Sequence, residues 1–108
     1  MELLPHMEFL VHMTVKHFPE VDIREQEAVR ACELARAGNL LRLWWVPGKC
    51  ENWGIWSAKD ARSLYEVFAS LPMFPHLRIR VHPLALHPDD PQMGDSLGTE
   101  PDSSDKWP

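Results

Sequence analysis

The chain has 108 residues, 44% of them hydrophobic, which is enough for one domain with one modest core. The formal net charge of -5 is concentrated in residues 88–108, where six acids meet one base, whereas residues 1–87 carry ten acids and ten bases. Because the body of the chain is neutral, its composition gives no indication of nucleic-acid binding. No apolar run approaches the ~20 residues of a membrane span, so no membrane association is expected.

The cysteine content and the N-terminal residues indicate in which cellular compartment the protein is expected. Two cysteines, Cys32 and Cys50, do not make a disulfide framework and predict two free thiols in a reducing environment. The N-terminus carries Glu2 in place of a basic start, and His6 and Glu8 interrupt its apolar run, which is not typical of a secretory signal. We therefore expect a cytoplasmic protein.

The first half of the chain predicts a strand, a helix and a second strand. Residues 7–16 alternate between two sets of side chains with a period of two, as a strand does. Residues 21–37 predict a helix, and Gly38 follows it as the residue that ends it. Residues 40–46 are rich in large apolar side chains and predict a second strand.

The second half of the chain begins with residues that are typical of a turn. The Pro-Gly pair at 47–48 predicts a turn, so residues 52–57 are expected to return as a third strand and to form a hairpin with the second. A second helix is expected to start at Ser57 or Ala58, because the apolar positions that follow have helical spacing, and to be stopped by Pro72.

Residues 76–84 alternate strictly and predict a fourth strand. The order β-α-β-β-α-β predicts an α+β, ferredoxin-like sandwich, in which an antiparallel sheet carries two helices on one face. The predicted domain is 7–87, with an N-terminal extension at 1–6. The acidic segment 88–108 has little apolar content and is expected to be flexible.

This fold leaves one sheet face without helices. Four of the five tryptophans fall in the second and third strands, and a small domain cannot bury them all under two helices. We therefore expect some of them to lie in a pocket or a subunit interface, and the protein to be a homo-oligomer. The open face is expected to carry His12, Thr14, Lys16, Arg78, Arg80 and His82, with either Arg42 and Trp44 or Leu41, Leu43 and Trp45, and with Trp53 or Trp56.

The first predicted helix contains a carboxylate in an unusual place. At 100° per residue, Glu27 lies on the same side of the helix as Ile23 and Leu34. Burial raises the pKa of a carboxyl group, and a raised pKa suits a general base that removes a proton from carbon. The alternative is that Glu27 extends past the edge of the apolar stripe, or pairs with Arg24 or Arg30.

Other reactive side chains give weaker signals. His76, His82 and His87 are close in sequence, but they form no i, i+4 helical pair and have no cysteine at a zinc-binding spacing, so no metal site is expected. Cys50 lies in a predicted turn with no positioned His-Asp pair, and we do not expect it to be a nucleophile.

An ordered set of motifs resembles the muconolactone delta-isomerase family from about Met7 to Pro88. The most specific part is LPMFP at 71–75, followed by the alternating strand and by Pro83-Leu84 and His87-Pro88. The other anchors are FLVHMTV at 9–15, Glu33, Leu34, Ala35, Arg36, Ala37 and Gly38, Leu43-Trp44, Gly48 with Asn52, and Val81.

The resemblance implies a ferredoxin-like fold, a decamer, and no metal or organic cofactor. It also implies a substrate and a reaction: muconolactone, an unsaturated lactone, loses a proton at the ring γ-carbon and regains one at the α-carbon, giving 3-oxoadipate enol-lactone. Such a reaction needs a base, a donor for the charge that develops on the lactone oxygen, and a cation for the free carboxylate, ideally an arginine.

The resemblance also implies site residues. The helix glutamate of the family aligns onto Glu27, which makes this residue the expected base. Asn52 and Trp44 are candidates for a hydrogen-bond donor and an apolar wall. Five side chains compete as the cation that binds the carboxylate, with Arg24 as a further candidate from the helix; the five are His12, Arg42, Arg78, Arg80 and His82.

The chain departs from the family pattern in four places. It has six extra residues before Met7, a shorter first connection between strand and helix, Trp45 where the family usually has arginine, and the acidic tail. These differences keep alternative functions open: a ligand-binding or dehalogenating protein that acts on a chlorinated or methylated muconolactone, or a cofactor-free monooxygenase of the same fold.

Overall fold

The computed structural model describes residues 6–92, so most of the predicted N-terminal extension and of the acidic tail lies outside the described residues. No helix in this range is long and apolar enough to span a membrane. The elements follow the predicted order, with one added 3₁₀ turn: β1 Met7–Val15, α1 Val21–Arg36, β2 Leu40–Trp45, β3 Glu51–Ala58, α2 Ala61–Ala69, the turn Phe74–His76, and β4 Leu77–Leu84.

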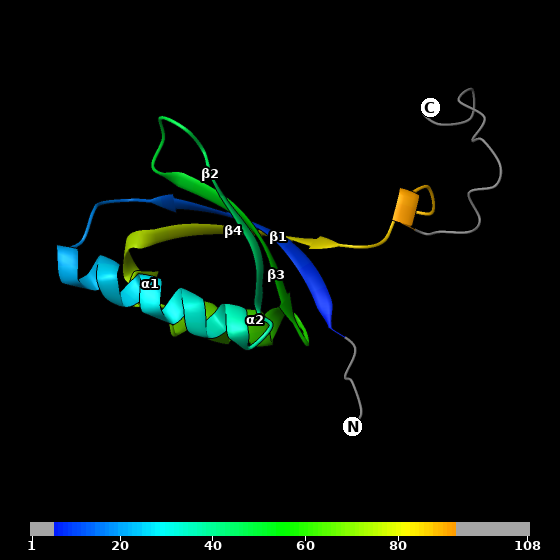
Figure 1. The fold of residues 1–108 in the computed structure, drawn as a ribbon, viewed down its shortest axis with the longest axis horizontal. Coiled ribbons are helices and arrows are strands. Elements are labelled where there is room, and N and C mark those ends of the chain that lie inside the picture. Colours follow the sequence, from blue (N-terminus) through cyan, green and yellow to red (C-terminus); the bar gives the residue numbers. More distant parts are fainter. Residues whose placement is uncertain (1–5, 93–108) are drawn as a thin grey trace.

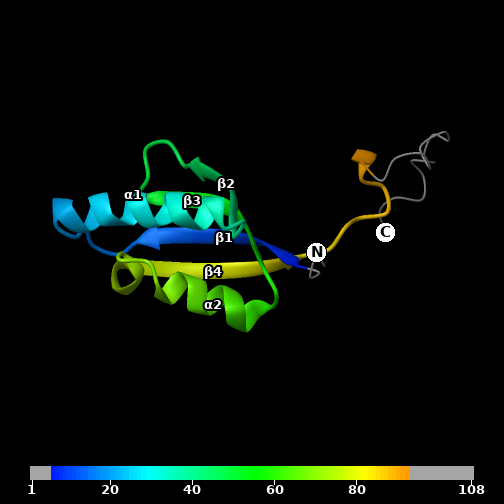
Figure 2. The same cartoon turned by 60° about the horizontal axis from the view of Figure 1, so that its bottom comes forward.

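The four strands form one antiparallel sheet in the order β2-β3-β1-β4. Both helices cover the same face of this sheet, and the other face carries no helix (Figure 1). Figure 2 shows α1 and α2 lying along the sheet, α1 beside β3 and α2 beyond β4. The α+β, ferredoxin-like prediction is therefore confirmed.

The Pro-Gly pair lies in the turn between β2 and β3, as predicted. Gly48 adopts a φ of 80°, in the left-handed region that glycine enters without steric cost. The Lys49 amide donates to the Val46 carbonyl at 3.1 Å, and the Val46 amide donates to the Glu51 carbonyl at 3.2 Å. The hairpin is thus closed on both sides of the turn.

The predicted start of the second helix is wrong. Ser57 and Ala58 belong to β3, where they pair with Glu8 and Met7 of β1, and α2 begins only at Ala61. Asp60 caps the helix, because its carboxylate accepts a hydrogen bond from the Ser63 amide at 2.7 Å. That hydrogen bond also lowers the pKa of Asp60. The helix then ends at Ala69, before Pro72.

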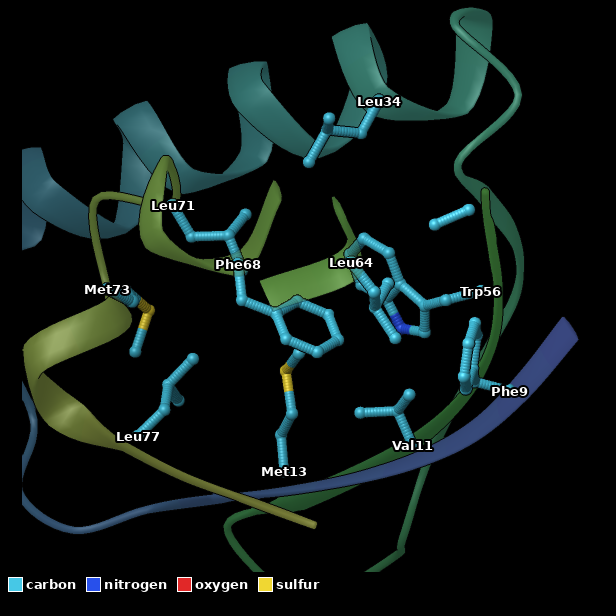
Figure 3. Close-up of a cluster of buried hydrophobic side chains, with 11 residues drawn as sticks. Phe9, Val11, Met13, Leu34, Trp56, Leu64, Phe68, Leu71, Met73 and Leu77 are labelled. Carbon is cyan, nitrogen blue, oxygen red and sulfur yellow. The ribbon is translucent and has the colours of Figure 1, made fainter. Parts of the chain in front are cut away.

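The core lies between the sheet and the helices (Figure 3). Phe9 and Val11 of β1 and Phe68 of α2 are completely buried. The register pairs Val11 with Val81, so the apolar side chains of β4 lie on the helix side with those of β1. This confirms the predicted direction of Leu77, Ile79 and Val81.

The open face carries the predicted cations. Thr14 pairs with Arg78, His12 with Arg80 and Leu10 with His82, and all six side chains point away from the helices. Lys16 lies beyond the end of β1.

A register shift between Leu40 and Arg42 decides the direction of the β2 side chains. Arg42 and Trp44 lie on the open face, and Trp44 pairs with Trp53 of β3. Leu43 and Trp45 lie on the helix side. As expected, the tryptophans are not all buried: Trp56 is 3% exposed, whereas Trp44 is 43% and Trp45 77% exposed.

Candidate active site

A cavity of about 600 Å³ opens on the helix side of the sheet, between α1, β2 and β3. Its volume falls in the range of small-molecule sites. Most of its wall is apolar, with contributions from Met13, Leu71 and Leu77. The polar side chains that line it are Arg24, Glu27, Lys49, Cys50, Glu51 and Asn52.

A larger hollow of about 940 Å³ lies at the other end of the domain, between the start of β1 and residues 84–92. Nearly all of the residues around it are exposed, from His6 and Glu8 to Leu86 and Gln92. An open surface of this kind does not exclude water from a ligand, and we therefore place the site in the smaller cavity.

Glu27 forms part of the cavity wall from α1. Its side chain is half-buried, and its Oε1 accepts a hydrogen bond from the Met73 amide at 2.9 Å. Burial raises the pKa of Glu27, and the Met73 amide offsets part of this rise. Arg30 bonds Glu33 and Ser70, so the alternative pairing of Arg30 with Glu27 is not formed.

Two cations line the same cavity. Arg24 lies one turn before Glu27 on α1, and Lys49 comes from the turn between β2 and β3. Both side chains are exposed, so their charges lie at the mouth of the cavity and reach solvent. A ligand with a carboxylate is expected to turn that group toward this rim.

The strand β3 contributes two buried polar atoms to the cavity wall. Asn52 and Trp56 both point to the helix side, and no described residue forms a hydrogen bond with Asn52 Oδ1 or Trp56 Nε1. Buried polar atoms usually have a partner, so these two are unusual among the atoms of the cavity wall.

Most of the other predicted candidates lie on the opposite face of the sheet. His12, Arg78 and His82 occupy the open face, as do Arg42 and Trp44. The sheet itself separates these side chains from Glu27, because successive residues of a strand point to opposite faces. Of the predicted candidates, Glu27, Asn52 and the further candidate Arg24 line the cavity.

The open-face candidates have partners there. His12 Nε2 lies 3.0 Å from Glu51 Oε1, and the His12 ring stacks on Trp53 at 4.3 Å. The Arg42 guanidinium lies over the Trp44 ring at 4.8 Å.

The predicted site lacked many contributors to the cavity, among them Lys49, Trp56 and the Met73 amide. Arg24 was named only as a further candidate, although its spacing of three residues from Glu27 places the two on one helix face. Lys49 had no such signal, because the hairpin brings it to the cavity. Within residues 6–92, no group of three or more His, Cys, Asp or Glu side chains is arranged to hold a metal ion.

Comparisons with known proteins identify one family and one fold. A family model described as muconolactone delta-isomerase matches residues 7–90. The muconolactone delta-isomerase of Pseudomonas aeruginosa is 30% identical over 95 residues, covering 78% of this chain and 99% of the relative. That of Cupriavidus pinatubonensis is 34% identical over 67 residues, covering 62% and 73%.

A crystal structure of muconolactone isomerase superimposes with a TM-score of 0.71 at 28% sequence identity. The match covers 79% of this chain and 95% of the solved one. The matched residues, the level of identity and the shared fold lead to one conclusion: this chain belongs to the muconolactone delta-isomerase family.

Proposed function

We propose that this protein isomerises muconolactone to 3-oxoadipate enol-lactone by moving a proton between two ring carbons. The observation that supports it most strongly is Glu27, a half-buried carboxylate with a raised pKa on the wall of a cavity of about 600 Å³. A base for a carbon acid needs such a pKa, and the family is one of isomerases. Family membership does not favour the dehalogenating or merely ligand-binding alternatives.

The chemistry assigns Glu27 two steps. Its carboxylate takes the γ-proton of the lactone, and the electron pair of that C–H bond shifts through the C=C bond toward the carbonyl oxygen. The same carboxyl group then returns the proton to the α-carbon. The Met73 amide holds Oε1 in place at 2.9 Å, which leaves Oε2 to face the substrate.

Arg24 is the proposed anchor for the free carboxylate of the substrate. It lies on the same helix face as Glu27 and at the cavity mouth, where the acetate arm of the lactone has access to solvent. A guanidinium binds a carboxylate through two parallel hydrogen bonds, which also fixes the orientation of the ring. Lys49 adds a second positive charge to the rim.

Asn52 is the proposed donor on the cavity floor. Its side-chain amide lines the cavity and is half-buried, and its Nδ2 is the group that would donate. A fixed amide stabilises charge that develops on a lactone oxygen, and does so more strongly where water is excluded.

A turnover assay on muconolactone tests the proposed function. The wild-type protein is expected to consume the lactone, and Arg24→Ala is expected to raise KM by about 10- to 100-fold with a smaller change in kcat, because one charged hydrogen-bonding group is lost. Arg36→Ala, at the far end of the same helix, is the matched control and is expected to leave KM unchanged. No consumption by the wild type would refute the function, and an unchanged KM in Arg24→Ala would refute the anchor.

We also propose that the protein works as a homo-oligomer, a decamer by resemblance, in the cytoplasm. Phe18, Leu43 and Trp45 are 63%, 49% and 77% exposed around the cavity mouth, an apolar rim that a second subunit would cover. The free, exposed thiols of Cys32 and Cys50 fit a reducing compartment. Light scattering is expected to give ten times the chain mass; a monomer at micromolar concentration would contradict the assembly.

A further inference from the structure

Arg30 ties α1 to the end of α2, three residues after Glu27. Its Nε and Nη2 both donate to the Ser70 hydroxyl, at 3.0 and 2.9 Å. That hydroxyl donates in turn to the Val67 carbonyl at 2.6 Å, which fixes it on the last turn of α2. The third guanidinium nitrogen, Nη1, donates to Glu33 at 3.0 Å. A planar guanidinium that is bonded at all three nitrogens has a fixed orientation, so this contact sets a distance between the two helices.

A second contact between the same two segments holds the proposed base. Glu27 Oε1 accepts a hydrogen bond from the Met73 amide at 2.9 Å. Glu27 lies three residues before Arg30, which is about one helical turn. Met73 lies three residues after Ser70. The two contacts are therefore neighbours, and a movement of Ser70 relative to α1 also moves the Met73 amide relative to the carboxylate.

The segment that links the two contacts is short and stiff. The Phe74 amide donates to the Leu71 carbonyl at 2.9 Å, which closes a turn around Pro72. Met73 has φ −83° and ψ 0°, as the third residue of a type I turn does, and proline is favoured as the second. The turn makes no use of the amide of its third residue, which leaves this N–H to the carboxylate. Leu71 and Met73 are both buried, so the core holds the turn in place.

The part of α1 that carries Glu27 is packed less tightly than this turn. Among the described residues of α1 only Leu34 is buried, and it lies in the second half of the helix (Figure 3). Ile23 is partly buried, and the residues between these two that line the cavity face an open space. A segment with few buried apolar contacts moves more easily than the core does. The contact between Arg30 and Ser70 is thus the tie that limits how far the carboxylate can move.

We propose that Arg30 and Ser70 are positioning residues for the reaction: together they hold the Met73 amide on Glu27 and keep its carboxylate aimed into the cavity. This inference rests on the proposed function, in which that carboxylate is the base. Neither Arg30 nor Ser70 lines the cavity, so both act through Glu27 and not on the substrate. A base that is held in one place spends less of each encounter in orientations from which no proton can be transferred.

The kinetic test compares Arg30→Ala and Ser70→Ala with Arg36→Ala, an exposed arginine on the same helix. Arg30→Ala and Ser70→Ala are each expected to lower kcat by about 10-fold with little change in KM, because the base is misplaced while the substrate contacts remain. Ser70→Thr keeps the hydroxyl and is expected to keep wild-type kcat. Because the two residues act through one contact, the double variant is expected to lose no more activity than either single variant.

The pH profile distinguishes positioning from a general loss of structure. The hydrogen bond from the Met73 amide favours the ionised carboxylate, so loosening it raises the pKa of Glu27. The rising limb of kcat/KM is therefore expected to move to higher pH in Arg30→Ala and in Ser70→Ala. The expected shift is up to about 1 pH unit, the size of one hydrogen bond. In Arg36→Ala the limb is expected to stay at its wild-type position.

The other charged and titratable groups around Glu27 are the same in every variant. In Ser70→Ala the guanidinium of Arg30 stays on Glu33 and adds no positive charge beside the base. The remaining groups that line the cavity affect all the profiles alike; they are Arg24 on α1 and Lys49, Cys50 and Glu51 of the hairpin. An unmoved limb in both single variants, or losses of kcat that add in the double variant, would overturn the proposal.

A second measurement does not depend on turnover. In a ¹H–¹⁵N spectrum, the Met73 amide peak is expected to move with pH as its acceptor, the Glu27 carboxylate, is protonated. Glu27→Gln is expected to abolish that movement, which assigns it. In Arg30→Ala and Ser70→Ala the midpoint of the movement is expected at higher pH, and in Arg36→Ala at the wild-type value.

The two readouts separate the two ideas. A shifted midpoint of the Met73 peak in the variants, without turnover of muconolactone by the wild type, would refute the proposed function and keep Arg30 and Ser70 as the residues that position Glu27. Turnover by the wild type, together with an unshifted midpoint in both variants, would refute the positioning role and keep the function.

Discussion

Glu27→Gln is expected to lower kcat on muconolactone by about 10³-fold, because glutamine keeps the size and the hydrogen bond of the side chain and loses its basicity. The Met73 amide still finds an acceptor in the glutamine carbonyl, so the cavity wall stays in place. The matched control is Glu25→Gln, an exposed carboxylate on the same helix, which is expected to keep wild-type kcat. Equal activity of Glu27→Gln and the wild type would show that another group is the base.

The stability of the same variant distinguishes lost chemistry from lost structure. Burial raises the pKa of Glu27, so the folded state binds this proton more tightly than the unfolded state does. The stabilising effect of that proton is fully present below the unfolded pKa, and it is lost as the pH rises through the folded pKa. At pH 7, Glu27→Gln is therefore expected to be at least as stable as the wild type.

This stability difference is expected to narrow as the pH falls toward the unfolded pKa of a glutamate, about 4.3. Urea unfolding of both proteins across this pH range provides the measurement. In the wild type, kcat/KM is expected to rise with pH through the raised pKa of Glu27, because the carboxylate is the active form. A Glu27→Gln protein that unfolds more easily at pH 7 would contradict the pKa assignment.

Phe68→Ala is expected to lower the free energy of unfolding by about 3–5 kcal/mol, a large part of the total for a domain of this size. Phe68 is completely buried in the last turn of α2, and its ring packs on that of Trp56 with centroids 5.1 Å apart. Removal of the ring leaves a cavity between the sheet and α2, and the backbone of neither element can move far enough to fill it. Urea or thermal unfolding measures the loss.

The control for this change is Glu66→Ala, an exposed position on the same helix, which is expected to alter stability by no more than about 0.5 kcal/mol. A loss below about 1 kcal/mol in Phe68→Ala would show that the core collapses around the gap. If the variant remains folded, its kcat is expected to fall as well, because the indole of Trp56 loses its packing partner.

Local patterns in the sequence were sufficient for the fold and for the inward position of Glu27, the base of the proposed site. The alternation of residues 77–84 placed Leu77, Ile79 and Val81 on the helix side, because a strand has a period of two. The helical period placed Glu27 with the apolar stripe of α1, at the wall where the structure has it. The direction of a side chain within one strand or helix depends on residues close in the chain, so the period of the sequence pattern predicts it.

Tertiary structure decided where the remaining groups lie. Ser57 and Ala58 stayed in β3 because β1 offered them pairing partners, which no local pattern shows. The shift between Leu40 and Arg42 turned Arg42 and Trp44 to the open face, and it turned Leu43 and Trp45 to the cavity side.

The sequence by itself thus determined the family, the order of the elements and the inward carboxylate of Glu27. It did not determine which residues lie with Glu27 around the cavity. Met73, Asn52 and Trp56 reach the cavity from segments far away in the chain, and long-range strand pairing and helix packing alone bring them together. The predicted strand cations are likewise kept from the cavity by the sheet face on which they lie, and that face is settled only when all four strands are in register.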